Sequence, residues 1–287
     1  MRIKGIIIEM KKKKFIENFF IYIGVTSAFF TIIGLICASD ISSFFDKNEN
    51  YKIYFIIIVG ALNLCFAGFS IRRKNKLSLD ITKKVHANVY YNDLFQSKGI
   101  IVIPVNDYFD TIVDDKIISS NTIHGKFINK FFKDNEKELK QKINKSLSSI
   151  EAIETNLSRK QGNKKRYPLG TVAIVKQVDK TFFLLALTKF NANHRAEITK
   201  SEYQRVIMQL FDFTEQHSQG FKINIPLIGN GHSGTELSEQ KLLEFILFSI
   251  TLHDKLTLSN GVDIILHKDV KDKIDLNKIN YYYNTEE

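Results

Sequence analysis

Tryptophan is absent from this 287-residue sequence, and cysteine and proline are scarce, with two and three residues. Both cysteines, Cys37 and Cys65, fall within apolar runs near the N-terminus. The rest of the chain therefore contains no disulfide, no thiol nucleophile and no cysteine-ligated metal. The histidines are not spaced like metal ligands, so we expect neither a metal site nor a cofactor.

Acidic residues are also in the minority, with 31 Asp and Glu against 41 Lys and Arg, which gives a net charge of +10. A basic excess of this size can indicate nucleic-acid binding. Here much of it lies in three blocks, at Lys11–Lys14, 72–84 and Lys160–Arg166. We find no module that interleaves basic residues with stacking aromatics, so we expect no nucleic-acid partner.

The sequence contains two long apolar runs near its N-terminus. Phe19–Ala38 is uncharged over 20 residues, and Ile53–Ile71 is uncharged over 19. A bilayer core requires about 20 helical residues, so each run is long enough to span it. A signal peptide would have a shorter apolar region of about 7 to 15 residues, and a pair of buried core helices would show a polar stripe. We therefore predict a transmembrane helical hairpin over residues 15–71.

Lysine and arginine placement predicts the orientation of this hairpin. Basic residues precede the first run at 1–14 and follow the second at 72–84, whereas the loop Ser39–Lys52 has two lysines and three acidic residues. The positive-inside rule therefore predicts that both termini are cytoplasmic. We expect a basic cytoplasmic N-terminus (1–14), the hairpin (15–71), a basic juxtamembrane linker (72–84) that can bind anionic headgroups, and a ligand-binding domain (85–287).

Small and polar residues within the two runs indicate helix contacts. Asn63 is the one strongly polar group in the middle of a run, and it either faces another helix or a water path or is simply tolerated. Small residues permit close packing within the hairpin or between protomers; they are Gly24, Ser27, Ala28 and Gly34 in the first run and Gly60, Ala61, Ala67 and Gly68 in the second.

The remaining residues alternate between apolar β-branched runs and segments with helical periodicity. This pattern predicts a three-layer α/β/α domain with a mixed sheet. Predicted strands are His86–Tyr91, Gly99–Val105, Gly170–Gln177, Phe182–Leu187, Phe221–Ile228 and Gly261–His267. Predicted helices are Thr199–Gln219, which opens with the capping-box pair Thr199 and Glu202, Thr235–His253, and a long helical region over Gly125–Leu157 that either packs on its own domain or joins protomers.

Two prolines mark the ends of predicted strands. Pro104 is followed by Asn106-Asp107, and Pro226 is followed by the glycine-rich segment Gly229–Gly234. Ligands of open α/β sheets bind at the carboxyl ends of strands, so we expect both loops to face one crevice. Glycines and a helix N-terminus suit a phosphate, but a plain strand-to-helix turn explains the glycine spacing nearly as well, and no Walker A lysine follows.

From Tyr90 to His267 the sequence resembles the macro domain family, whose members bind ADP-ribose and its derivatives. The resemblance implies that Asp93 contacts the adenine, that Asn106 contacts the distal ribose, and that loops at Thr122–Gly125 and Pro226–Gly234 hold the diphosphate. The implied ligand-binding residues are Asp93, Leu94, Asn106, Asp107, Thr122, Ile123, His124, Gly125, Gly229, Asn230, Gly231, His232, Ser233 and Gly234.

The first of these loops departs from the hydrolytic members of that family. It reads Ser119–Gly125, is bulkier than their glycine-rich loop, and has no obvious water-activating residue beside it. We therefore interpret the domain as a binding domain and not an enzyme. His124 and His232 contact the ligand or stabilise their loops, Asp110 and Thr111 orient the Asn106 loop, and Asn191 and Arg195 line the crevice or cap the next element.

Two membrane helices followed by this divergent macro domain resemble the effectors of type II Thoeris antiphage systems. The resemblance implies a TIR-domain partner that converts NAD into an ADP-ribose-derived second messenger of the histidine–ADP-ribose type. It further implies a multi-pass protein of the bacterial inner membrane that assembles into a homo-oligomer and disrupts the bilayer. The alternatives are a membrane-anchored ADP-ribosyl hydrolase and a passive membrane scaffold.

Overall fold

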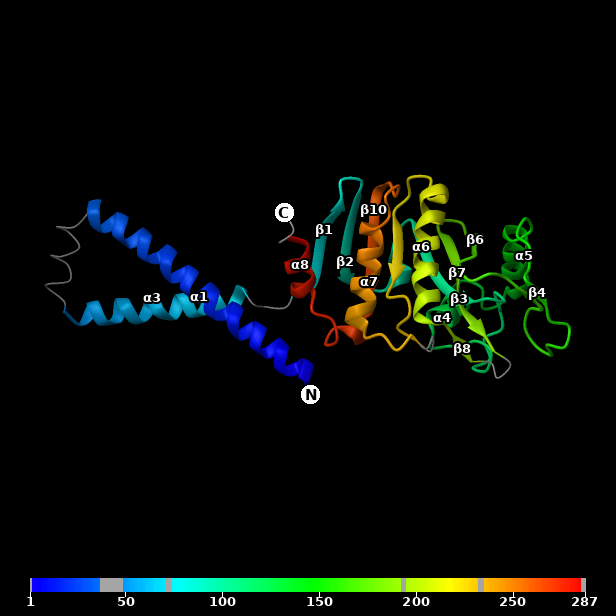
Figure 1. Cartoon of the computed structure of the whole chain (residues 1–287), viewed down its shortest axis with the longest axis horizontal. Coiled ribbons are helices and arrows are strands. Elements are labelled where there is room, and N and C mark those ends of the chain that lie inside the picture. The colour runs from blue at the N-terminus through cyan, green and yellow to red at the C-terminus, as the bar shows by residue number, and fades with distance from the viewer. Residues whose placement is uncertain (1, 37–48, 71–73, 192–194, 232–234, 285–287) are drawn as a thin grey trace. The chain divides into compact units, whose positions relative to one another are not determined.

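The computed structural model describes residues 2–36, 49–70, 74–191, 195–231 and 235–284 (Figure 1). The chain divides into two compact units, Met1–Arg73 and Lys74–Glu287. The second unit begins within the segment 72–84 that we expected to be a linker, because Lys76–Thr82 forms strand β1. Leu77, Leu79 and Ile81 alternate with exposed residues and face the core, a period-2 pattern that marks a strand with one buried face.

The first unit consists of helices α1 (Arg2–Ile36) and α3 (Glu49–Ser70). The basic segment 1–14 is not a separate element, since α1 begins at Arg2 and continues through it. The apolar part of α1, Phe15–Gly34, is long enough to cross a membrane, whereas that of α3, Ile53–Phe69, is shorter than the length required. Of the two predicted spans, the described residues thus contain one that qualifies by length and composition. Ile71, the last residue of the second predicted span, lies outside the described residues.

Helices α1 and α3 contact each other in antiparallel order. Tyr22 meets Phe66 with ring centroids 6.0 Å apart, and Phe30 meets Phe55 at 5.0 Å. Between these pairs, the Asn63 amide nitrogen donates to the Thr26 hydroxyl at 3.3 Å. Asn63 therefore faces the other helix, which is one of the two roles that we expected.

The four glycines among the predicted small residues lie away from neighbouring atoms. An added Cβ at any of the four glycines would meet no atom within 4 Å; these are Gly24, Gly34, Gly60 and Gly68. The glycines therefore lie off the α1–α3 contact, whereas Ala67, another of the predicted small residues, is fully buried.

The second unit is built on one mixed sheet with the strand order β1-β2-β10-β9-β3-β7-β6. Five strands at its centre run parallel, and β1 and β6 (Val172–Lys176) pair antiparallel at the two edges. The parallel strands, in their spatial order, are β2 (Val85–Tyr91), β10 (Leu258–Leu266), β9 (Ile223–Pro226), β3 (Ile100–Asn106) and β7 (Thr181–Phe190). The short strand β8 (Ala196–Glu197) pairs with the end of β7.

Helices cover both faces of this sheet (Figure 1). In β3, Ile100 and Val102 join the hydrophobic cluster of α6 (Lys200–His217) and α7 (Glu239–Thr251), while Ile101 and Ile103 join that of α4 (Ile123–Phe131) and α5 (Glu136–Ser146). Successive residues of a strand point to opposite faces, so an apolar strand requires cover on both. The predicted three-layer α/β/α fold with a mixed sheet is confirmed.

Short elements complete the unit. They are the 3₁₀ helices η1 (Leu94–Gln96) and η2 (Lys268–Val270), the hairpin strands β4 (Glu154–Thr155) and β5 (Lys165–Arg166), and the helix α8 (Leu276–Asn284). The long helix predicted over Gly125–Leu157 is wrong in extent. It is broken between α4 and α5, where Phe132 turns into the core, and α5 ends at Ser146, so Ile153 lies exposed beyond it.

The other two helix predictions hold with shifted boundaries. Helix α6 starts after Thr199, and the capping box between Thr199 and Glu202 is present as predicted. Helix α7 starts at Glu239 after the N-cap Ser238, four residues later than the predicted start.

Candidate functional site

A cleft of about 1500 Å³ runs across the carboxyl ends of the five parallel strands. Both predicted loops line it, the one after β3 and the one after β9. The strand order spreads the candidate residues along the cleft: Asp93 follows β2, His267 follows β10, Gly229 follows β9, Asn106 ends β3, and Phe190 ends β7. The arrangement brings together residues that are far apart in the sequence, such as Asp93 and His267.

Asp93 stands at the β2 end of the cleft and is held by local contacts. One carboxylate oxygen accepts from the Phe95 backbone N–H at 2.9 Å, which caps η1, and the other lies 3.6 Å from the Lys130 ammonium. An N-cap carboxylate of this kind is fixed in direction. Leu94 lines the cleft beside it.

The first loop ends at the N-terminus of α4. Thr122 is the N-cap: its hydroxyl accepts from the Gly125 N–H at 3.0 Å and donates to the Ser119 carbonyl at 2.7 Å. Thr122, Ile123 and His124 line the cleft, so the first turn of the helix faces it. The N–H groups of a first turn have no partner within the helix and form a natural anion site.

Gly125 is required for packing and is not a cleft residue. A Cβ at this position would lie 2.2 Å from the Ser119 carbonyl oxygen, so only glycine allows the loop to close on the helix. The structure therefore gives this predicted ligand residue a structural role.

His124 is buried at the cleft wall, and its burial lowers the pKa of the ring to about 4, although the nearby Asp110 acts in the opposite direction. The carboxylate and the backbone of Asp110 both favour the charged ring, but burial has the larger effect on its pKa. At neutral pH His124 is thus an uncharged imidazole, which has one N–H donor and one acceptor nitrogen. It therefore brings no positive charge to the cleft.

The second loop approaches the cleft with its backbone. Gly229 has a φ of +88°, and a Cβ there would lie 3.0 Å from the side chains of Leu242 and Tyr203. Tyr203 also donates its hydroxyl to the Ile228 carbonyl at 3.0 Å, which fixes the end of β9 to α6. Asn230 and Gly231 line the cleft with Gly229, while the predicted His232, Ser233 and Gly234 lie outside the described residues.

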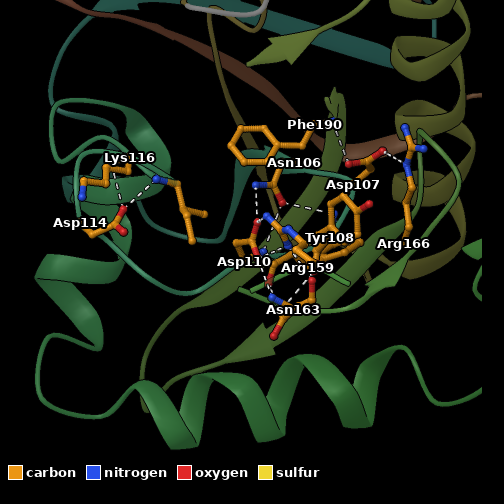
Figure 2. A network of polar contacts seen from close by, with 12 residues as sticks. Asn106, Asp107, Tyr108, Asp110, Asp114, Lys116, Arg159, Asn163, Arg166 and Phe190 are labelled. Carbon is orange, nitrogen blue, oxygen red and sulfur yellow. Dashed lines mark hydrogen bonds and ion pairs between the residues drawn. The ribbon is translucent and has the colours of Figure 1, made fainter. Parts of the chain in front are cut away.

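Asn106 lies where β3 ends, at the centre of a polar network (Figure 2). Its amide nitrogen donates to the Asp110 carboxylate at 2.9 Å, and its amide oxygen accepts from the N–H groups of Tyr108 and Asp110, each at 3.2 Å. The prediction that Asp110 orients the Asn106 loop agrees with these bonds. One N–H of the amide is used in this way, and an asparagine amide has two.

Asp107, which we predicted as a ligand residue, is turned away from the cleft. Its carboxylate forms an ion pair with Arg166 at 2.6 Å and accepts from the Phe190 N–H at 3.1 Å. Burial raises the pKa of Asp107, and the Arg166 guanidinium opposes that rise. The residue is 1% exposed and fixes the loop to β5 and β7, so its role is structural.

Several cleft and supporting residues were missed by sequence reasoning. The segment Asp115–Ser119 lines the cleft and is closed by hydrogen bonds from Ser120 to Asp115 and from two N–H groups to Asp114. Adjacent aspartates are a turn signal that pointed to it. We left two roles open for Arg195, and the structure shows the first of them: it lines the cleft together with Glu197.

A second constellation lies on strands β1 and β2, outside the cleft. The Ser78 hydroxyl is 2.9 Å from His86 Nε2, and His86 Nδ1 is 2.7 Å from the Asp80 carboxylate. These are the distances of a nucleophile, base and orienting acid. The Asp80 side chain is 88% exposed, however, whereas the acid of such a triad is buried, so we interpret the group as a surface polar cluster.

Within the described ranges, no group of three or more His, Cys, Asp or Glu residues is arranged to hold a metal ion. The cleft is instead lined by mixed charges and backbone. Its cationic side chains are Lys116, Lys126, Lys130, Arg195 and Lys268, and its anionic ones are Asp93, Asp115, Glu197 and Asp269.

Residues 87–267 match the family model described as Thoeris protein ThsA, Macro domain. The chain is 29% identical over 251 residues to the Thoeris protein ThsA of Bacillus amyloliquefaciens (strain Y2), an alignment that covers 84% of this chain and 81% of that protein. Among solved structures, the Oceanobacillus iheyensis macrodomain with ADP superposes with a TM-score of 0.51 at 12% identity, covering 73% of this chain and 97% of that one. The same macrodomain with MES bound gives 0.51 at 13% identity, covering 73% and 98%. These likenesses show the macrodomain fold.

Proposed function

The chain belongs to the family of the Thoeris protein ThsA macro domain, and from this premise we propose that its cleft binds an ADP-ribose-derived signal in antiphage defence. The signal would be made by a partner TIR-domain enzyme and be of the histidine–ADP-ribose type. Its capture would drive the chain to assemble in the bacterial inner membrane and disrupt the bilayer. On this proposal the protein is a binding effector and not an enzyme.

The order of residues along the cleft is the observation that carries the proposal. From β2 to β7 the strand order presents the Asp93 carboxylate, then the glycine loop after β9, then Asn106, and the α4 N-terminus lines the same cleft. ADP-ribose is built in the same order, from an adenine through a diphosphate to a distal ribose. A carboxylate accepts from an adenine amino group, backbone N–H groups bind phosphate, and an amide binds hydroxyls.

The neutral state of His124 assigns it to a ribose and not to the diphosphate. An uncharged imidazole brings no positive charge to a phosphate. Its one donor and one acceptor nitrogen match a ribose hydroxyl, which both donates and accepts. We therefore propose that the phosphates are bound by the α4 first turn and the Gly229–Gly231 loop.

The end of the cleft beyond Asn106 suits a charged terminal group. Thr188, the register partner of Asn106, and Phe190 both line the cleft, and Phe190 is paired with Ala196 of β8. There Glu197 of β8 and Arg195, which directly precedes β8, offer side chains of opposite charge. A free amino acid carries a carboxylate and an ammonium, so this pair supports a ligand that has an amino acid joined to the ribose.

For the membrane step, we propose that α1 and α3 form a two-span hairpin with both chain termini in the cytoplasm. The α1–α3 contact and the qualifying apolar length of α1 support this proposal. The glycine-bearing faces of both helices are open and suit close contact between copies. Ligand binding can shift assembly only if the assembled state binds the ligand more tightly.

Calorimetry on the full-length protein in detergent tests the binding step. We expect saturable binding of ADP-ribose, tighter binding of its histidine conjugate, and weaker binding of both to Asp93→Ala. Asp80→Ala, an exposed aspartate outside the cleft, is the matched control and should bind as the wild type does. If ADP-ribose and its conjugate fail to bind the wild type, the proposed function is wrong.

Particle size tests the assembly step and separates it from hydrolysis. Addition of the histidine conjugate to detergent-solubilised protein should increase the particle size, and in vesicles it should increase permeability. A membrane-anchored hydrolase would instead release ADP-ribose with turnover that disappears in Asn106→Ala. Turnover without a change in size would replace the effector proposal with the hydrolase alternative.

A further inference from the structure

A buried arginine outside the cleft contacts the loop that ends β3. Arg159 lies on the segment between β4 and β5, and its guanidinium binds the Asp110 carboxylate with two bonds of 2.8 and 2.7 Å. Both side chains are almost completely buried, at 7% and 0% exposure. Two parallel bonds from a guanidinium to a carboxylate fix direction as well as distance.

Asp110 joins this arginine to Asn106 of the cleft wall. Its carboxylate accepts from the Asn106 amide at 2.9 Å. The same carboxylate also accepts from the Asn163 N–H at 2.8 Å. Figure 2 shows Arg159, Asn163 and Asn106 converging on Asp110 from different parts of the chain.

Arg159 also packs against a second cleft residue. Its guanidinium lies 4.1 Å from the centre of the Tyr108 ring and 5.6 Å from that of Phe190, which lines the cleft. Cation–π contacts of a buried guanidinium favour one ring orientation. One side chain is thus connected to Asn106 through Asp110 and to Phe190 directly.

The segment that carries Arg159 is shaped for this contact. Gly162 has a φ of +81°, and a Cβ there would lie 2.4 Å from Asp110 Oδ1. The Asn163 amide donates to the carbonyls of Tyr108 and Phe109 at 3.1 and 2.6 Å. The segment 154–166, which we call the β4–β5 arm, therefore meets the loop after β3 through side chain and backbone together.

We propose that Arg159 is a positioning residue for ligand binding: it holds Asn106 through Asp110 and Phe190 by direct contact, in the geometry that the ligand requires. The identity of the ligand in this inference rests on the proposed function. The positioning itself rests only on the contacts of Arg159 and Asp110. It adds the β4–β5 arm, which contributes no residue to the cleft wall, to the determinants of affinity. A preorganised wall binds more tightly because less order is lost on binding.

Two measurements on the full-length protein in detergent test this role. Calorimetry with ADP-ribose should show affinity reduced by about tenfold or more in Arg159→Ala, the scale for loss of a charge-assisted network. Hydrogen exchange should become faster in the peptide covering 106–111, because Tyr108 and Asp110 lose their fixed acceptor. Leu247→Ala, in a fully buried position on α7 across the sheet, is the control for stability loss and should change neither result.

A rescue experiment separates positioning from general destabilisation. Guanidinium ion at millimolar concentration should restore part of the affinity of Arg159→Ala, whereas it should not affect the wild type. Arg159→Lys keeps the positive charge but loses the two parallel bonds of the guanidinium. It should fold more readily than Arg159→Ala and bind with an affinity between those of Arg159→Ala and the wild type. Wild-type affinity in both Arg159 variants, or an equal loss in Leu247→Ala, would overturn the proposal.

The exchange measurement keeps the two proposals distinguishable. If ADP-ribose and its conjugate do not bind the wild type, the proposed function fails, but faster exchange at 106–111 in Arg159→Ala still supports the positioning of the loop. Unchanged exchange in that variant would overturn the role of Arg159 whatever the ligand is.

Discussion

The two loops that line the cleft are built in opposite ways. The loop after β3 is held by side chains: Asn106, Asp110 and Arg159 are buried and bonded to one another. The loop after β9 is held by backbone shape, with Gly229 at positive φ against α6 and α7, and Gly231 with no atom within 4 Å of an added Cβ. One loop presents fixed side chains and the other presents open backbone.

This difference assigns different chemistry to the two loops. Fixed side chains recognise groups with direction, such as ribose hydroxyls, because their donors and acceptors are already oriented. Open backbone approaches a diffuse anion such as a diphosphate, which needs N–H groups at close range. Substitutions in the side-chain network of the loop after β3 should therefore lower the free energy of unfolding. Substitutions at the exposed part of the loop after β9 should lower ligand affinity alone.

The largest effect is expected from Asp110→Ala, which leaves the buried Arg159 without its partner. An unpaired buried charge costs about 3 to 5 kcal/mol of the free energy of unfolding, measured by urea denaturation. Asp114→Ala, in which a partly exposed carboxylate accepts from two N–H groups nearby, is the control and should cost about 1 kcal/mol. Equal losses in the two variants would contradict the comparison.

The next effect depends on pH and concerns His124. Its pKa is about 4 in the folded chain and 6.5 ordinarily, so the unfolded chain binds more protons between these values. The free energy of unfolding should therefore fall as the pH drops from 6.5 to 4, by roughly 1.4 kcal/mol per unit. The slope should be smaller in His124→Gln and unchanged in His217→Gln, an exposed histidine on α6.

An unchanged pH slope in His124→Gln would mean that the ring is already solvated and available for protonation. The assignment of His124 to a ribose hydroxyl would then fail, because a charged imidazole suits a phosphate.

A smaller effect separates the two glycines of the second loop. Gly229→Ala places a Cβ at positive φ, 3.0 Å from two core side chains, and should cost about 1 to 2 kcal/mol of the free energy of unfolding. Gly231→Ala meets open space and should leave that free energy within about 0.5 kcal/mol of the wild type. Thermal and urea denaturation both measure this, and a large loss in Gly231→Ala would show that the loop is packed more closely than described.

The smallest effect is expected at the N-cap of α4. Thr122→Ala should cost about 1 kcal/mol, as should Ser238→Ala at the N-cap of α7. The two variants share the loss of one cap bond, but only Thr122 lies at the cleft. ADP-ribose affinity measured by calorimetry should fall in Thr122→Ala alone, and equal affinities would show that the α4 N-terminus does not hold the diphosphate.

The sequence predicted the layers of the fold because these depend on local pattern. Continuous apolar strands such as Ile100–Asn106 require cover on both faces, and the Thr199–Glu202 capping box marked the start of α6. Strand β1 was missed because the alternation of Leu77, Leu79 and Ile81 covers only a few residues. It lies within a basic segment that we interpreted as a linker.

The cleft loops were predictable from where the strands end, but the support of the loops was not. Asp110 and Arg159 are 49 positions apart, and nothing local to either residue indicates the other. Asp107 followed Asn106 in the motif, yet alternation along the chain turns it toward Arg166 instead of the cleft. Gly125 was read as a ligand contact because the need for close packing against Ser119 depends on the path of a loop.

The most direct test of the central claim is calorimetric titration of ADP-ribose into the full-length wild type and Gly231→Ala, each with its free energy of unfolding measured alongside. The account predicts saturable binding to the wild type and an affinity at least about tenfold weaker in Gly231→Ala, with the stability of the two proteins equal. Binding of equal affinity to both, or no binding to the wild type, would contradict a diphosphate held by the backbone of the loop after β9.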